Sequence, residues 1–146
     1  MGDVTYDGLK LENQICFPLY AASREIIKQY KPYLDELDLT YTQYIAMLIL
    51  WEKKSLTVKK MGEFLYLDSG TLTPLLKKLE SKGLLTRARS TEDERNLNVT
   101  ITEKGEKLKE QAVNVPAKMA QCSKLEQEEA LMLYRLLYKM LGKPEI

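Results

Sequence analysis

The sequence predicts a mainly α-helical chain with one small β-hairpin, and three features lead to that prediction. Apolar residues recur at helical spacing in several segments that short polar connections separate. One region, residues 84–101, shows instead two short runs typical of strands around a polar loop. The 146 residues, 45% of them hydrophobic, are enough for one compact domain with a core. We therefore expect an α+β fold that forms a single domain over residues 1–146.

The first expected helix covers residues 9–33 and is rich in apolar side chains. Pro18 lies inside it, where the ring would remove a backbone donor and crowd the carbonyl of Gln14. We therefore expect a kink at Pro18. The apolar stripe of this helix is broader than one small domain can cover, and it contains Leu11, Ile15, Leu19, Ala22 and Ile26.

A linker and a second helix are expected next. Residues 31–32, which are Lys-Pro, and residues 37–40 have the composition of a connection between helices. The second helix is expected over residues 41–52. Its spacing predicts a core face made of Tyr44, Ile45, Leu48 and Trp51.

Two short helices joined by a tight turn are predicted in the middle of the chain. The first covers residues 57–65, and the side chain of Thr57 can cap it. After only Tyr66 and Leu67, a second begins, which Asp68 can cap and Gly83 can end. Its apolar face consists of Leu72, Leu75, Leu76 and Leu79. This is the helix-turn-helix arrangement, whose second helix enters a DNA groove.

The opposite face of that second helix is small and hydroxylated near its start and basic toward its end. Residues 69–89 carry five basic side chains and one acid, a balance of +4, so the rest of the chain carries −3 of the net +1. Such a surface suits contact with phosphates, whereas the alternative is the solvated face of an ordinary helix. We expect DNA contacts from Ser69, Gly70, Thr71, Thr73, Pro74, Lys77, Lys78, Arg87 and Arg89.

The predicted hairpin follows this helix directly. Residues 84–89 and 97–101 are the expected strands, and residues 90–96 form the polar loop between them. A β-hairpin in this place is a wing. Residues 41–101 would thus form a winged helix-turn-helix, the DNA-binding part of the domain.

The remaining segments are expected to form dimerisation helices, over residues 8–36 and 102–146. Thr102 can cap a helix that runs through Leu108 and Ala112 and bends at Pro116. The last helix, residues 126–141, is apolar over most of its circumference. Because a helix on the surface of a single chain should not be apolar on most sides, we expect this helix to pack against a second subunit in a homodimer.

Composition excludes several other functions. No apolar run approaches the ~20 residues that a membrane span requires, and the N-terminus lacks the basic-then-apolar order of a signal peptide. We expect a cytoplasmic protein without membrane contact, whose two cysteines stay reduced. The chain has no histidine, which removes Cys-His and Ser-His nucleophilic pairs. Two cysteines are too few for a structural zinc site, so we expect neither a metal nor a cofactor.

Cys16 has two interpretations. A cysteine among Ile15, Phe17 and Leu19 is most often a small, inert core residue. It becomes reactive where hydrogen-bond donors stabilise the thiolate. Without histidine, tyrosine hydroxyls are the best candidate donors in this chain.

The order of helices and several motifs resemble the MarR family of dimeric winged-helix regulators. The motifs are residues 67–75, residues 92–97 and residues 102–105. Within that family, residues 11–17 and 39–44 are similar to the organic-hydroperoxide-resistance branch, which senses oxidation of a thiol. The resemblance covers nearly the whole chain.

The resemblance implies a redox site and a wing contact. Cys16 would be the peroxide-reactive thiol, hydrogen-bonded by Tyr30 and by Tyr41, the latter from the other subunit, with Tyr20 close by. Asp93 would hold the guanidinium of Arg95 for the minor groove. Cys122 would be a resolving thiol contributed across the dimer. Alternatively, a small cellular thiol would capture the oxidised Cys16, or the sulfur would be over-oxidised.

These features lead to one main hypothesis and two alternatives. The main hypothesis is a dimeric repressor that binds an inverted-repeat operator in double-stranded DNA and releases it when an organic hydroperoxide oxidises Cys16. One alternative is a relative that responds to an anionic aromatic ligand or acts as a thiol-based global regulator. The other is a thiol peroxidase, which would have no use for the basic helix and wing.

Overall fold

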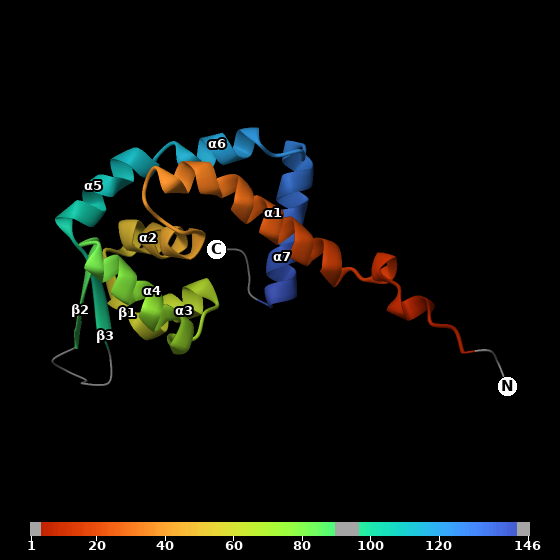
Figure 1. Cartoon of the computed structure of the whole chain (residues 1–146), viewed down its shortest axis with the longest axis horizontal. Helices are drawn as coiled ribbons and strands as arrows, with labels where there is room; N and C mark the ends of the chain where they lie inside the picture. Colours follow the sequence, from red (N-terminus) through yellow and green to blue (C-terminus); the bar gives the residue numbers. More distant parts are fainter. Residues whose placement is uncertain (1–3, 90–96, 143–146) are drawn as a thin grey trace. The chain divides into compact units, whose positions relative to one another are not determined.

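The computed structural model describes residues 4–89 and 97–142, and the chain divides into two compact units, residues 1–115 and 116–146. The first unit begins with two short 3₁₀-helices, Asp7–Leu9 and Leu11–Asn13. Its helices and strands then follow in the order α1 (Cys16–Asp35), α2 (Tyr41–Lys53), β1 (Ser55–Thr57), α3 (Val58–Leu65), α4 (Ser69–Ser81), β2 (Leu85–Arg89), β3 (Leu97–Ile101) and α5 (Glu103–Ala112) (Figure 1). α6 (Val115–Gln121) begins at the boundary, and α7 (Gln127–Leu141) lies in the second unit.

The start of the first helix differs from the prediction. α1 begins at Cys16, because the residues before it form 3₁₀ turns that side chains hold in place. The Asn13 amide donates to the Asp7 carbonyl at 2.7 Å, and the Gln14 amide donates to the Gly8 carbonyl at 2.6 Å. Pro18 therefore occupies the first turn, where backbone amides have no acceptor within the helix. The predicted kink at Pro18 is wrong for that reason.

The end of α1 also differs from the prediction. The helix continues through Pro32, which the sequence analysis assigned to the linker, and ends at Asp35. Because α1 passes Pro32 only one turn before its end, the ring costs a single internal hydrogen bond. Most of α1 carries exposed apolar side chains, and Leu34 is its buried residue.

α2 confirms the second predicted helix, with a different buried face. A capping box starts it, in which the Thr40 hydroxyl accepts from the Gln43 amide at 3.3 Å and the Gln43 side chain accepts from the Thr40 amide at 3.1 Å. Leu48 was expected in the core but is 42% exposed. The core face consists of Gln43, Tyr44, Ala46, Met47, Leu50 and Trp51.

α2 lies at the centre of the first unit, where it contacts α1, α3, α4 and α5 (Figure 1). The core around it is fully buried and aliphatic, apart from the aromatic rings that α2 itself carries. Burying each such side chain contributes roughly 1.5–3 kcal/mol. The largest fully buried side chains among the described residues are Leu34, Met47, Leu50, Met61, Leu72, Leu76, Leu79, Leu85 and Val99.

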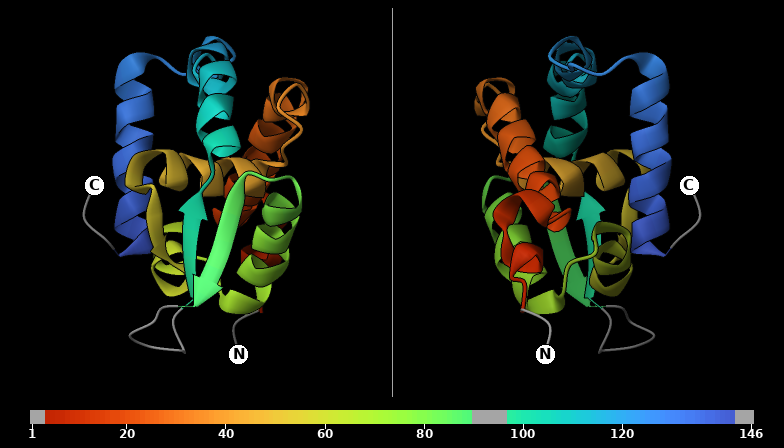
Figure 2. Two further views of the ribbon diagram at one scale, coloured as in Figure 1. Left: turned by 90° about the vertical axis from the view of Figure 1, so that its left-hand side faces the viewer. Right: turned by 90° about the vertical axis from the view of Figure 1, so that its right-hand side faces the viewer.

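The sheet confirms the predicted hairpin and adds a strand that the sequence analysis missed. β2 and β3 pair antiparallel, with Arg87 opposite Val99 and Leu85 opposite Ile101. β1 pairs antiparallel with the other edge of β3, so the strand order is β1-β3-β2 (Figure 2). This third strand ties the segment before the helix-turn-helix to the wing.

α5 begins in close contact with the end of α4. Thr102 caps it, as predicted, by accepting a hydrogen bond from the Gly105 amide at 3.1 Å. A Cβ at Gly105 would lie 2.3 Å from the Leu84 carbonyl oxygen, so only glycine allows this approach. The Trp51 indole donates to the Gly105 carbonyl at 2.9 Å and fixes α5 on α2. The helix ends at Ala112, before the predicted bend at Pro116.

The last helix confirms its predicted place and is exposed along most of its length. A capping box formed by Glu126 and Glu129 starts α7, and Gly142, whose φ is 75°, caps its end after Leu141. The rings of Tyr134 and Tyr138 lie with centroids 4.8 Å apart. Its exposed apolar side chains are Leu131, Met132, Leu133, Tyr134, Leu136, Met140 and Leu141.

Candidate DNA-binding surface and redox site

The helix-turn-helix is built as predicted. Thr57 caps α3 by accepting from the Lys60 amide at 3.1 Å. The turn closes at Tyr66, which adopts a left-handed conformation with φ 56°. A Cβ at Gly62 would lie 2.6 Å from the Leu67 carbonyl oxygen, so the glycine lets α3 approach the turn closely. Together these contacts set the crossing of α3 and α4.

Asp68 fixes the first turn of α4. Its carboxylate accepts a hydrogen bond from the Thr71 amide at 2.8 Å, and this bond holds the pKa of Asp68 below its usual range. The Thr73 hydroxyl donates to the Ser69 carbonyl at 2.8 Å, which orients that hydroxyl. These two hydrogen bonds therefore fix the first turn of α4.

The predicted DNA face of α4 is open to solvent. All four predicted leucines are buried on the side that meets the core. Thr73 is half-buried. The exposed members of the predicted contact set are Ser69, Gly70, Thr71, Pro74, Lys77 and Lys78.

Arg87, which was expected to contact DNA, is bound to Glu80 within the chain. Its backbone amide donates to the Glu80 carboxylate at 2.9 Å, and its guanidinium donates to the same carboxylate at 3.1 and 3.3 Å. These bonds hold the pKa of Glu80 below its usual range. Arg87 thereby ties β2 to α4, whereas Arg89 lies exposed near the end of β2. Asp93 and Arg95, the predicted wing contacts, lie outside the described residues.

Cys16 is the first residue of α1 and is exposed. Tyr20 lies one turn further on the same helix, and its hydroxyl accepts from the Arg24 guanidinium at 3.3 Å. Tyr30 lies fourteen residues after Cys16, which at 1.5 Å per residue is about 21 Å along the helix axis. Within one chain, therefore, the structure does not bring Cys16 to Tyr30.

The structure does bring the two predicted tyrosines together. The rings of Tyr30 and Tyr41 lie with centroids 5.0 Å apart, at the corner between α1 and α2. Tyr44, which the sequence analysis did not assign to this site, lies 5.7 Å from Tyr30 and 6.4 Å from Tyr41. The sequence could have indicated Tyr44, because it follows Tyr41 by three residues and residues at that spacing are neighbours on a helix.

Burial is the main cause that raises the pKa of Tyr30, Tyr41 and Tyr44 above 10. Their mutual proximity adds to the effect at Tyr30 and Tyr44. All three phenols therefore keep their protons at neutral pH. A half-buried phenol in that state can donate a hydrogen bond to an anion such as a thiolate.

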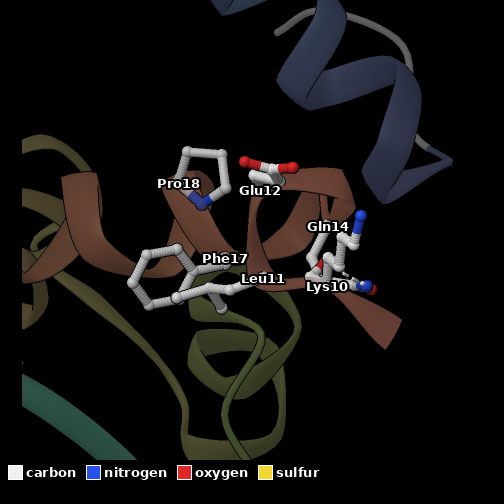
Figure 3. A pocket seen from close by; sticks show the side chains of 6 residues that line it. All are labelled: Lys10, Leu11, Glu12, Gln14, Phe17 and Pro18. Atoms are coloured by element: carbon white, nitrogen blue, oxygen red, sulfur yellow. Dashed lines mark hydrogen bonds between the residues drawn. The ribbon is translucent and has the colours of Figure 1, made fainter. Parts of the chain in front are cut away.

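Residues before and after Cys16 in the sequence line an open hollow of about 710 Å³, and Cys16 itself is not part of the lining. Figure 3 shows Phe17 and Leu11 side by side, with Pro18 and Glu12 on another side. Lys10 and Gln14 complete the lining. The hollow therefore combines apolar side chains with one basic and one acidic residue, Lys10 and Glu12.

Cys122 directly follows α6, is half-buried, and forms no disulfide with another described residue. It belongs to the second unit, whereas Cys16 belongs to the first. Across residues 4–89 and 97–142, no cluster of three or more His, Cys, Asp or Glu side chains is placed to hold a metal ion. In the same residues, no helix has the length and apolar character needed to cross a membrane.

A family model described as "Transcriptional regulator SarA/Rot" matches residues 28–112. The organic hydroperoxide resistance transcriptional regulator of Bacillus subtilis is 57% identical over 136 residues, which are 93% of this chain and 92% of that regulator. The HTH-type transcriptional regulator SarZ of Staphylococcus saprophyticus is 47% identical over 133 residues, 91% of each chain.

Solved structures of AbfR from Staphylococcus epidermidis are also similar. Reduced AbfR bound to DNA superposes with a TM-score of 0.76 at 34% identity and covers 93% of this chain and 95% of that one. AbfR is also known in an overoxidised form bound to DNA and in a disulfide form. This chain therefore belongs to the MarR family of winged-helix transcriptional regulators, in the organic-hydroperoxide-resistance branch, and is a DNA-binding regulator rather than an enzyme.

Proposed function

We propose that this chain is a cytoplasmic, homodimeric repressor that leaves an inverted-repeat operator when an organic hydroperoxide oxidises Cys16. The observation that carries the proposal is the separation of the exposed Cys16 from the Tyr30–Tyr41 pair along α1. One chain holds a thiol at one end of the helix and phenol donors at the other. Two antiparallel copies of α1 would bring each thiol to the other copy's phenols, so we assign both Tyr30 and Tyr41 to the opposite subunit.

The apolar surface of α1 supports a dimer. Its exposed side chains have no cover in a single chain, and a surface of this kind is typical of an interface between subunits. They are Phe17, Leu19, Tyr20, Ile26 and Ile27, and Ile15 directly before the helix is exposed as well. α7 carries a second such set. Truncation after Ser123 should remove the α7 set, give a monomer in sedimentation and abolish tight operator binding, because two linked half-site readers bind far more tightly than one.

The chemistry at Cys16 is a two-electron oxidation. The thiolate lone pair forms a bond to the terminal oxygen of the hydroperoxide as the O–O bond breaks, and the alkoxide leaves and takes up a proton to become an alcohol. The sulfur becomes a sulfenic acid. Phenol donors from Tyr30 and Tyr41 would favour the thiolate that starts the reaction. Leu11, Phe17 and Pro18 of the open hollow would receive the organic part of the oxidant.

The fate of the sulfenic acid decides the lasting form of the switch. The Cys122 thiol of the second subunit can condense with it, which forms a disulfide and releases water. A small cellular thiol can do the same from solution. In both cases the Cys16 sulfur no longer accepts the phenol hydrogen bonds as an anion, and the contact between the subunits changes at that point.

DNA recognition rests on α4 and the wing. Thr71 and Thr73 lie near the start of α4, where base edges are read, and Lys77 and Lys78 lie further along it, where phosphates are met. A two-fold dimer would place two α4 helices in successive major grooves about 34–36 Å apart. Asp93 and Arg95 are proposed as the wing contact in the minor groove.

The experiment is a gel shift with the DNA upstream of the chain's own gene. Reduced protein should bind this DNA, cumene hydroperoxide should release it, and a thiol reductant should restore binding to the disulfide forms. Binding that the hydroperoxide leaves unchanged, although mass spectrometry shows Cys16 oxidised, would reject the proposed switch while leaving DNA binding intact.

A ligand-responsive regulator is the second candidate, and one observation favours it. A hollow of about 270 Å³ beside Tyr41 is lined by the apolar side chains of Ile27, Leu34 and Leu39 and by the charged residues Lys28, Lys31 and Asp35. Such a site suits a small anionic aromatic molecule. Release of operator by an aromatic carboxylate, without oxidant, would favour this function over peroxide sensing.

A further inference from the structure

Lys82, the residue directly after α4, turns its ammonium toward the corner between α1 and α2. The ammonium donates to the backbone carbonyl of Asp38 and to the side-chain oxygen of Gln43, the latter at 3.2 Å. It also lies 3.5 Å from the Asp38 carboxylate. The Lys82 side chain is 29% exposed, whereas the Asp38 side chain is 91% exposed, so the ion pair lies at the surface and the bond to Gln43 is the more buried contact.

The corner that Lys82 holds is the one that carries Tyr41. Asp38 adopts a left-handed conformation with φ 54°, which fixes the direction of its carbonyl. Gln43 is 4% exposed, and the oxygen that accepts from Lys82 also accepts from the Thr40 amide in the capping box of α2. Tyr41 is the first residue of that helix. One oxygen atom therefore joins the start of α2 to the end of α4.

The end of α4 is also held from its other side. The Lys104 ammonium donates to the Lys82 carbonyl at 2.8 Å, and the Thr102 hydroxyl donates to the Gly83 carbonyl at 2.5 Å. Both donors belong to the start of α5. The residues after α4 thus lie between two supports, and a movement of the α1–α2 corner acts on α4 through Lys82.

We propose that Lys82 is a positioning residue that couples the redox site at Tyr41 to the orientation of the DNA-reading helix α4. The inference rests on the proposed function. When the oxidised sulfur of the other subunit releases the phenols, the start of α2 and the Asp38 carbonyl shift, and the Lys82 ammonium follows the two oxygens to which it donates. α4 then turns out of register with the major groove.

The operator affinities of the reduced and oxidised protein distinguish a coupling role of Lys82 from a purely structural one. If Lys82 only stabilises the domain, its loss lowers the free energy of unfolding and weakens operator binding equally in both redox states. If it couples the sites, its loss changes the ratio of the two affinities, because that ratio measures the coupling.

The test measures operator dissociation constants by fluorescence anisotropy for reduced and hydroperoxide-oxidised full-length protein. Lys82→Met keeps the length of the side chain and removes the cation, and we expect the oxidised-to-reduced ratio to fall about tenfold from that of the parent. The rate of Cys16 oxidation should be unchanged. Lys82→Arg should restore most of the ratio. Lys78→Met, a neighbouring exposed lysine on α4, should weaken binding in both states and leave the ratio intact.

A second variant and a hydrogen-exchange measurement test the same coupling. Gln43→Met removes one acceptor and leaves the Asp38 carbonyl, so it should lower the ratio less than Lys82→Met does. Hydrogen exchange should show residues 36–43 and 78–84 changing together on oxidation in the parent and separately in Lys82→Met. A parent-like ratio in Lys82→Met, or joint exchange in that variant, overturns the coupling role. A parent that keeps its operator on oxidation overturns the proposed function and, with it, this inference.

Discussion

The ring of Tyr30, near the end of α1, lies with its centroid 5.0 Å from that of Tyr41, at the first residue of α2. Tyr44 contacts both rings but is 3% exposed, whereas Tyr30 and Tyr41 are half-buried. Two of the three phenols are therefore open to a group that arrives from outside the chain. The third is enclosed among the residues of the core, beside Trp51.

This difference predicts which tyrosine affects the thiol. Tyr41→Phe removes a donor that can reach the other subunit's Cys16, so alkylation of Cys16 by iodoacetamide near neutral pH should slow several-fold. Tyr44→Phe is the matched control, since its hydroxyl is enclosed. Stopped-flow or mass-spectrometric labelling measures both rates. Equal slowing in the two variants would remove Tyr41 from the redox site.

The salt dependence of operator binding separates the two kinds of basic residue in the contact set. Lys77 is exposed on α4, so Lys77→Met should reduce the slope of log K against log salt by about 0.9. Arg87 is bound to Glu80, so Arg87→Met should leave the slope unchanged and lower the free energy of unfolding instead. A reduced slope for Arg87→Met would return Arg87 to the surface that meets phosphate.

The stability of the first unit depends on the close approach at Gly105. A Cβ there would lie 2.3 Å from the Leu84 carbonyl oxygen and 2.7 Å from Cγ1 of Ile101. Gly105→Ala should therefore lower the free energy of unfolding by about 1–3 kcal/mol, measured by urea denaturation. Gly8→Ala, where a Cβ meets open space, is the control. If both variants unfold alike, α5 does not pack as described.

Asp68 gives the helix-turn-helix a pH dependence. The Thr71 amide lowers its pKa in the folded state below the ordinary value of 3.8, so the stabilisation is present above that value and is lost as pH falls through the lower folded pKa. Asp68→Ala should be less stable than the parent at pH 7, and the difference should shrink in acid. Asp68→Asn keeps an acceptor that does not titrate and should resemble the parent at pH 7. A difference between Asp68→Ala and the parent that stays constant down to pH 2 would contradict the assignment.

The parts of the fold that the sequence predicted correctly are those with local causes. Asp68 and Thr57 each cap the helix that follows by accepting from a backbone amide three residues later, and the four leucines of α4 repeat at helical spacing. The missed parts have causes distant in sequence. β1 is three residues long and exists because it pairs with β3, some forty residues later. The start of α1 was misplaced because Asn13 and Gln14 hold 3₁₀ turns through carbonyls that periodicity does not report.

The candidate site divides in the same way. The exposed face of α4 followed from amphipathic spacing, whereas the Glu80–Arg87 pair needs the turn between α4 and β2, which no helical pattern describes. The contact of Tyr30 with Tyr41 depends on how α1 and α2 meet. The resemblance to the family named both tyrosines and assigned Tyr41 to the other subunit. The length of α1 adds that Tyr30 lies out of reach of Cys16 in the same chain.

The central claim, that Cys16 is the switch, is tested most directly by one comparison of operator binding with and without cumene hydroperoxide. Cys16→Ser should bind the operator as the parent does and stay bound after treatment, because serine cannot form a sulfenic acid. Cys122→Ser, the matched cysteine variant, should still be oxidised at Cys16 and release the operator once a small thiol is added. Release of Cys16→Ser by the hydroperoxide, to the same extent as the parent, would contradict the account.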